Sequence, residues 1–226
     1  MYPVSSSSTP GLATPPHESD DPVIDAFRVL RWASARFDDQ LCVTASFGDA
    51  TLAHLAHSAL PGIEITLLDT GYLFAETEWF AEDLASRHGL NIKIVRPEPD
   101  LERNVWQSDT AACCAARKVD PLKRALEGHQ AWVTGLRRSD SESRRAAPMV
   151  HDDLLRNVTK INPLAAWTEA HVAGYAAAHD LPEHPLVDRG YESLGCWPCT
   201  KPVAEGDDPR SGRWANTTKT ECGLHL

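Results

Sequence analysis

The chain has 226 residues, of which 42% are hydrophobic and 24% charged, a balance that supports one globular domain and argues against global disorder. Its 32 Asp and Glu residues against 22 Lys and Arg residues give a net charge of −10, which disfavours non-specific binding to nucleic acid or anionic lipid. The sequence has no apolar run of the roughly 18 residues that a membrane span needs and no signal-peptide pattern over residues 1–20, so we expect a cytoplasmic protein.

Residues 1–20 are rich in Ser and Pro and are predicted to form a flexible tail. The domain should begin at the pair Asp21-Pro22, an N-cap followed by proline in the first helical turn. Beyond it, short β-rich runs at 41–45, 63–68, 91–95, 131–134 and 158–161 alternate with helical patterns at 50–60, 75–88, 109–127 and 168–179. Asp120-Pro121 predicts a break in the third of these helices.

This alternation predicts a single α/β domain over residues 21–200, with a mostly parallel twisted sheet flanked by helices. Residues 201–226 are rich in Gly, Pro, Asp and Arg and lack periodicity, so we expect a mobile C-terminal segment. No feature of the sequence fixes an oligomeric state.

Three of the predicted strands end in small or polar residues. In parallel sheets, ligands bind beyond the carboxyl ends of the strands. Any one of these sequences is typical of an ordinary turn without a ligand, but three at one sheet edge favour a nucleotide pocket. Residues 117–145 also carry eight Lys and Arg against four Asp and Glu, which points to a small anionic ligand. The turns are Ser46-Phe-Gly-Asp49, Asp69-Thr70-Gly71-Tyr72 and Gly135-Leu-Arg137-Arg138.

The cysteines suggest a metal group. Cys113 and Cys114 are adjacent on a predicted helix, and Cys196 and Cys199 form a spaced pair. Four thiolates suit tetrahedral zinc or an iron–sulfur cluster, and adjacent cysteines fit the larger cluster better because neighbouring helical side chains diverge. The alternatives are two small buried residues and a redox dithiol.

Two further features accompany the cysteine pairs. Arg117 and Lys118 each follow one helical cysteine by four residues and so share its face. Cys222 lies near the end of the chain, where Arg210, Arg213 and His225 are candidates to lower its pKa towards a reactive thiolate.

Taken together, these residues resemble the phosphosulfate reductase family, and within it the iron–sulfur branch of assimilatory adenylyl-sulfate (APS) reductases. The likeness spans residues 41–226. Besides the strand-end turns, it rests on Cys113-Cys-Ala-Ala-Arg-Lys118, Cys196-Trp-Pro-Cys199, Arg210-Ser-Gly-Arg-Trp214 and Lys219-Thr-Glu-Cys-Gly-Leu-His225. The Ser46 turn lacks the fuller Ser-Gly-Gly-x-Asp-Ser pattern of related ATP-pyrophosphatases, which argues against an ATP-cleaving relative.

The resemblance implies an adenine nucleotide alpha-hydrolase-like fold and a [4Fe–4S] cluster on Cys113, Cys114, Cys196 and Cys199. It also implies thioredoxin-dependent reduction of APS to sulfite and AMP in sulfate assimilation, through an S-sulfocysteine on Cys222. Thioredoxin or a similar dithiol protein would be the partner. The residues then expected to bind substrate are Ser46, Asp49, Asp69, Thr70, Gly71, Lys118, Gly135, Arg137, Arg210, Arg213 and His225.

Two alternatives remain open at this stage. One is a reductase for the 3′-phosphorylated substrate (PAPS), although that branch generally lacks the four cluster cysteines. The other is a zinc-stapled nucleotide- or RNA-binding or tRNA-thiolating protein, against which the net charge of −10 weighs.

Overall fold

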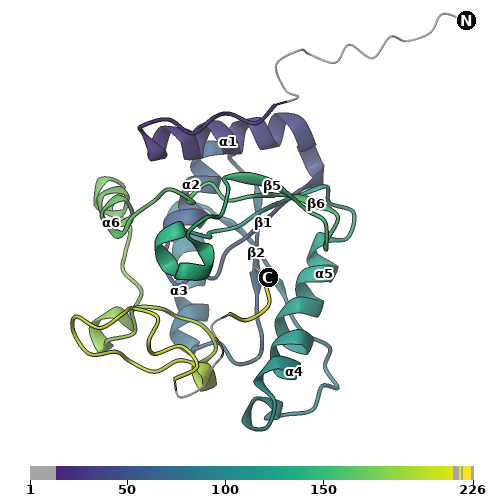
Figure 1. The fold of residues 1–226 in the computed structure, drawn as a ribbon, viewed down its shortest axis with the longest axis vertical. Coiled ribbons are helices and arrows are strands. Elements are labelled where there is room, and N and C mark those ends of the chain that lie inside the picture. Colours follow the sequence, from purple (N-terminus) through teal and green to yellow (C-terminus); the bar gives the residue numbers. More distant parts are fainter. Residues whose placement is uncertain (1–13, 216–218, 220, 225–226) are drawn as a thin grey trace, which may run out of the picture.

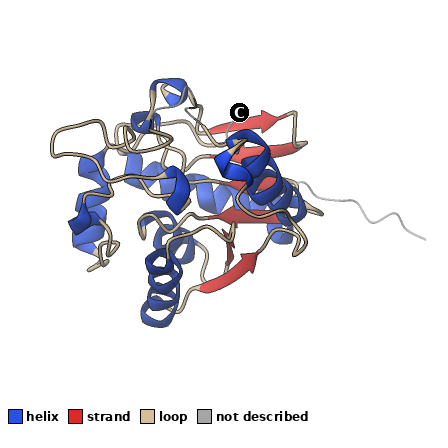
Figure 2. Cartoon of the chain, turned by 90° about the horizontal axis from the view of Figure 1, so that it is seen from below, coloured by secondary structure: helices blue, strands red, loops and turns tan. Residues whose placement is uncertain are grey.

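The computed structural model describes residues 14–215, 219 and 221–224. In this part of the chain a six-stranded sheet carries helices on both faces (Figure 1), and Figure 2 shows the strands between the helical layers. The strands are β1 (Leu41–Thr44), β2 (Glu64–Leu68), β3 (Asn91–Val95), β4 (Ala131–Val133), β5 (Val150–Asp153) and β6 (Val158–Ile161). The α-helices are α1 (Pro22–Phe37), α2 (Thr51–Ala59), α3 (Ala75–His88), α4 (Thr110–Cys114), α5 (Asp120–Leu126) and α6 (Glu169–Ala178).

The strand order is β3-β2-β1-β4-β6-β5. The first five strands in this order pair in parallel, and β5 pairs antiparallel with β6 at one edge. The predicted mostly parallel α/β fold is therefore confirmed. The chain leaves β1 towards β2 on one side and returns to β4 on the other, so the sheet has its topological switch point between β1 and β4. Helices long and apolar enough to cross a membrane are absent from the described residues.

The central strands β1 and β4 bury side chains on both faces of the sheet, since successive residues point to opposite faces. Leu41 and Val43 belong to the larger core, together with apolar side chains of α1, α2, α3 and α6. Cys42 between them points to the opposite face, where it packs with Trp132 and with Leu122 of α5. The central strands β1 and β4 are thus buried on both sides, which explains their continuous apolar runs, whereas the edge strand β3 is mostly exposed.

Local sequence signals account for most element boundaries. The Asp21 side chain accepts hydrogen bonds from the backbone N–H groups of Val23 and Ile24, so the predicted N-cap is present. Strand β5 was not predicted, because its sequence Val-His-Asp-Asp has neither alternation nor β-rich composition. As an edge strand it pairs with a single neighbour, and polar residues are tolerated there.

The predicted helix at 109–127 is a helical run with three parts. Helix α4 passes into a π-helical turn over Ala115–Val119, and α5 begins at Asp120. Pro121 has no N–H for the carbonyl of Arg117, so the α-helical hydrogen-bond pattern is interrupted there. The predicted break is therefore a change of hydrogen-bonding pattern within a continuous helical run.

Candidate functional site

A cavity of about 1000 Å³ opens at the switch point of the sheet. The loops that follow β1 and β4 form one wall, the start of α2 lies beside them, and the loop segment 181–215 with the C-terminal residues closes the opposite side. Figure 1 shows this segment in green and yellow beside the ends of the strands. The predicted substrate residues that line the cavity are Ser46, Asp49, Lys118, Gly135, Arg137, Arg210 and Arg213.

The loop after β1 is held in a strained conformation. Phe47 is buried and has a φ of 53°, in the left-handed region that a bulky residue rarely adopts. Asp49 accepts a hydrogen bond from the N–H of Thr51 at 2.8 Å, which closes a turn before α2. The loop therefore places the N-terminal turn of α2 against the cavity, where free N–H groups favour an anion.

The cavity is rich in arginine donors. Burial and the neighbouring Arg210 cation lower the pKa of Arg213, whose guanidinium lies over the Trp214 ring at 4.6 Å. The Nε atom of Arg213 and the Nη1 atom of Arg137 are buried and have no hydrogen-bond partner within the described part of the chain. Buried donors of this kind need an acceptor. A ligand with several anionic oxygens would satisfy both arginines.

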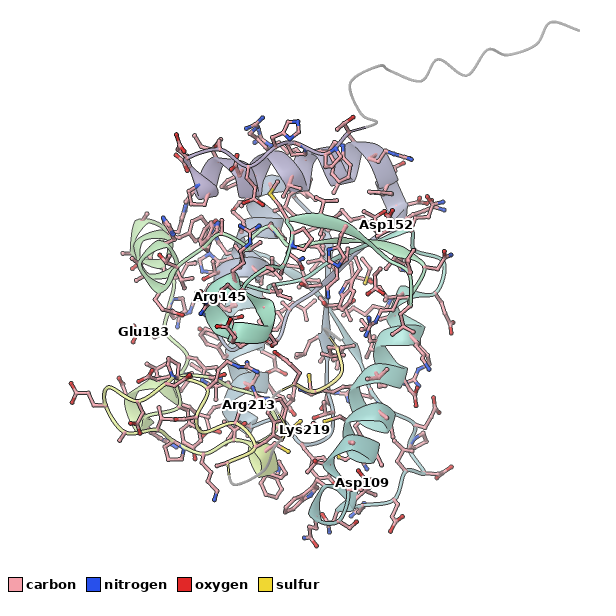
Figure 3. All side chains as sticks on the ribbon, in the orientation of Figure 1. Asp109, Arg145, Asp152, Glu183, Arg213 and Lys219 are labelled. Atoms are coloured by element: carbon pink, nitrogen blue, oxygen red, sulfur yellow. The ribbon has the colours of Figure 1, made fainter. Side chains whose placement is uncertain are left out.

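Cys222 lines the same cavity, beside Lys118, Arg210 and Arg213. Figure 3 shows the labelled Arg213 and Lys219 in the space between the 181–215 segment and α4. Burial acts to raise the pKa of Cys222, but the Lys118 cation, the Leu224 backbone N–H and the Arg213 cation outweigh it. The net pKa of Cys222 lies below its ordinary value, so the geometry favours a thiolate, which is the nucleophilic form.

A second, smaller cavity brings the two cysteine pairs together. Cys113 and Cys114 reach it from α4, and Cys196 and Cys199 from the turn around Trp197. Burial raises the pKa of Cys113, and negative charge on Cys114 and Cys196 raises it further. Burial likewise raises the pKa of Cys199, with the other three cysteines adding to it. The four sulfurs are thus close enough to repel one another when ionised.

The lining of this cavity is rich in sulfur. Within the described ranges, no three Cys, His, Asp or Glu side chains are placed to hold a single metal ion. The described lining offers four sulfurs and the cations Arg117 and Lys118, without a carboxylate or an imidazole. The buried Nε1 of Trp106 is a donor without a partner among the described residues. This donor set fits an anionic, sulfur-ligated cluster better than one ion.

Lys118 lines both cavities. Burial acts to lower its pKa, but nearby negative charge on Cys196 and Cys222 outweighs burial and raises the pKa above its ordinary value. The ammonium group therefore lies between the cysteine cavity and the Cys222 thiol, and is charged at neutral pH.

Three predicted substrate residues lie outside the lining of the large cavity. The Asp69 carboxylate accepts hydrogen bonds from the Gly71 N–H at 2.8 Å and from Arg96 Nε at 2.9 Å. Thr70 lines the cysteine cavity instead, with its hydroxyl 3.2 Å from Cys196 Sγ. Gly71 has a φ of 72°, and a side chain there would be strained. His225 lies outside the described residues.

Two residues of the cavity, Arg144 and Glu221, were not predicted from the sequence as site residues. Both line the large cavity and form an ion pair across 77 positions of the chain. The only signal for Arg144 was its membership of the basic stretch 117–145.

The fold and the strand-end cavity define an α/β protein of the adenine nucleotide alpha-hydrolase-like type. A family model for the phosphoadenosine phosphosulfate reductase domain matches residues 40–202, so the chain belongs to that family. The adenosine 5′-phosphosulfate reductase of Streptomyces coelicolor is 45% identical over 207 residues, 88% of each chain. That of Mycolicibacterium smegmatis is 41% identical over 208 residues, 89% of this chain and 88% of the relative.

A solved structure shares the fold. The phosphoadenylyl-sulfate (PAPS) reductase of Candida auris, in complex with phosphate, superimposes with a TM-score of 0.68 at 25% identity. The match covers 83% of this chain and 100% of the Candida chain.

Proposed function

We propose that this protein reduces APS to sulfite and AMP, with Cys222 as the nucleophile. The observation that carries the proposal is the position of Cys222 in the strand-end cavity, beside Lys118, Arg210 and Arg213. A thiol with a lowered pKa there faces buried arginine donors that need anionic oxygens. The relatives that match most of the chain carry the name of the same reaction.

The chemistry has two steps. The Cys222 thiolate attacks the sulfur of APS, the bond from sulfur to the phosphate oxygen breaks, and AMP leaves with the electron pair. Cys222 then carries a sulfonate as S-sulfocysteine. A dithiol protein of the thioredoxin type attacks the Cys222 sulfur and expels sulfite, and its second thiol releases Cys222 while the partner forms a disulfide. The dithiol thus supplies both electrons.

Different residues bind the two ends of APS. Arg137, Arg210 and Arg213 bind the sulfate and phosphate oxygens, because guanidinium groups match tetrahedral oxyanions. Ser46, Asp49 and Gly135 line the adenosine and phosphate end. Asp69, Thr70 and Gly71 act from outside the cavity by shaping the turn that reaches Cys196. His225 stays a predicted contact.

Cys113, Cys114, Cys196 and Cys199 would hold a [4Fe–4S] cluster. When bound, the cluster supplies a cross-link between α4 and the 196–199 turn and a negative charge beside Lys118. All six cysteines are free of disulfides, which fits the reducing cytoplasm where thioredoxin-type dithiols act. For the segment predicted over residues 201–226, we propose that its described part, residues 201–215, 219 and 221–224, opens for the dithiol partner; residues 1–13 of the tail predicted over 1–20 lie outside the described residues.

The test is anaerobic purification followed by iron and sulfide analysis and a sulfite assay with reduced thioredoxin. About four irons per chain and faster turnover of APS than of PAPS are expected. The variant Cys222→Ser should keep its iron and release no sulfite, whereas Cys113→Ser should lose iron. Faster turnover of PAPS would support the other branch of the family. A colourless zinc protein that releases no sulfite would overturn the proposal.

A further inference from the structure

The residue before Cys222 is a buried carboxylate. The Glu221 side chain is 4% exposed, and its two oxygens accept hydrogen bonds from Arg144 Nε at 2.8 Å and Nη2 at 2.7 Å. Arg210 Nη2 lies 3.7 Å from the same carboxylate. A bidentate, nearly dry pair of this kind is both stronger and more directional than an exposed ion pair.

Arg144 is in turn fixed from the sheet side. Its Nη1 donates to Asp140 at 2.8 Å, and Asp140 accepts from Arg137 Nε at 2.9 Å. Burial opposes the charge on Arg144, but the Glu221 and Asp140 carboxylates outweigh burial and hold its pKa above the ordinary value. A continuous chain of ion pairs therefore runs from the loop after β4 to the residue next to the nucleophile.

The other side of Cys222 is anchored more weakly. The Gly223 carbonyl accepts a hydrogen bond from Arg156 Nη2 at 3.0 Å. Leu224 packs against the smaller core, which includes Leu122 and Trp132. Glu221 is thus the charged anchor of a short docked segment with the thiol at its centre.

We propose that Arg144 is a positioning residue: through Glu221 it holds Cys222 in the strand-end cavity, and release of this pair lets the docked residues 221–224 leave the cavity. The assignment rests on the proposed function only in naming Cys222 as the nucleophile; the docking of the segment does not depend on it. An ion pair suits a segment that must come and go, because both ions regain hydration when the segment leaves. An equally buried apolar side chain would gain no such hydration when the segment leaves.

The test compares Arg144→Gln and Glu221→Gln with a matched control, Arg145→Gln. Arg145 is the next residue along the chain, but it is 75% exposed and pairs with Glu142, which is 76% exposed. The readouts are amide hydrogen exchange over residues 219–224 and the rate at which iodoacetamide alkylates Cys222, followed by peptide mass spectrometry. Alkylation is measured at pH 9.5, above the ordinary thiol pKa of about 8.5, so that differences in thiolate fraction contribute little.

Arg144→Gln and Glu221→Gln should each raise the alkylation rate of Cys222 by about tenfold or more, because each removes one partner of a buried charge pair. The control should leave the rate unchanged. The double variant should exceed neither single variant, because both remove the same interaction. Glu221→Gln lies in the C-terminal segment, so it keeps the test valid if Arg144→Gln folds poorly.

A purely substrate-binding role of Arg144 predicts something else: a higher KM for APS with unchanged hydrogen exchange and alkylation. That outcome, or equal rates for Arg144→Gln and Arg145→Gln, overturns the proposal. These readouts need no substrate. Failure of the wild-type protein to reduce APS would therefore count against the proposed function and not against the anchoring role of Arg144.

Discussion

A lysine in the core gives the sharpest stability prediction. Lys160 lies on β6, is 4% exposed, and its Nζ sits 4.8 Å from the centre of the Trp132 ring. Burial, and after it the neighbouring Arg156 cation, lowers its pKa from 10.5 to about 8. Lys160 is nevertheless protonated at pH 7 in both the folded and the unfolded chain, so the folded state bears the cost of a buried charge.

The size of this cost follows from the two pKa values. The difference between 10.5 and about 8 corresponds to about 3.4 kcal/mol at about 1.36 kcal/mol per pKa unit. The cation–π contact with the Trp132 ring offsets about 0.5–2 kcal/mol of this cost. We therefore expect Lys160→Met to raise the free energy of unfolding at pH 7 by about 1.4–2.9 kcal/mol.

The pH dependence has a definite sign. Between pH 8 and 10.5 the unfolded wild-type chain keeps the Lys160 proton that the folded chain has lost, so wild-type stability rises with pH in this window. The advantage of Lys160→Met should shrink accordingly. Urea unfolding followed by tryptophan fluorescence at pH 7 and pH 10 measures both effects. Lys123→Met, at a lysine that is 69% exposed, is the control.

Two results would refute the reasoning. One is a Lys160→Met variant that is less stable than wild type at pH 7. The other is a stability difference that does not change between pH 7 and pH 10, because the buried charge would then not be its cause.

Two further predictions concern the cavity and the histidines. In Gly195→Ala the new Cβ would clash with the Arg213 guanidinium, so the guanidinium must move. Steady-state kinetics should show a KM for APS raised about tenfold with little change in melting temperature. Burial, with His179 and His88 nearby, lowers the pKa of His54 to about 4. The folded state therefore resists protonation, and stability should fall as the pH drops from about 6.5 towards 4. Partial exposure limits the loss to about 1 kcal/mol, and thermal unfolding of His54→Gln should show a flatter pH profile.

The architecture was predictable where one physical pattern dominates. Buried parallel strands read as short apolar runs, and Asp21-Pro22 encodes a helix start in two residues. The three strand-end turns were also recognisable as turns. The role of Asp69 was not predictable, because its carboxylate turns back to the Gly71 N–H and to Arg96, the residue that follows β3. A turn sequence shows that polar atoms are present and not where they point.

The ion pair beside Cys222 lay beyond sequence reasoning for a different reason. Arg144 and Glu221 are 77 positions apart, and neither belongs to a periodic pattern. Charged residues in basic or polar stretches are mostly solvated. The pair becomes meaningful only when the fold shows both side chains buried and in bidentate contact, and Asp140 fixing Arg144 from the other side.

In the helical run that carries Cys113 and Cys114, the sequence predicted a break but not the π-helical turn that the structure shows there. Pro121 was readable as a break, because it lacks the N–H that an α-helix needs. The structure resolves the break into a π-helical turn over Ala115–Val119, directly before α5. A wider turn changes the angular position of every side chain it contains relative to those in α4. Lys118 lies in this turn and lines both cavities, so the proline-linked turn is what places one ammonium group between the four cysteines and Cys222.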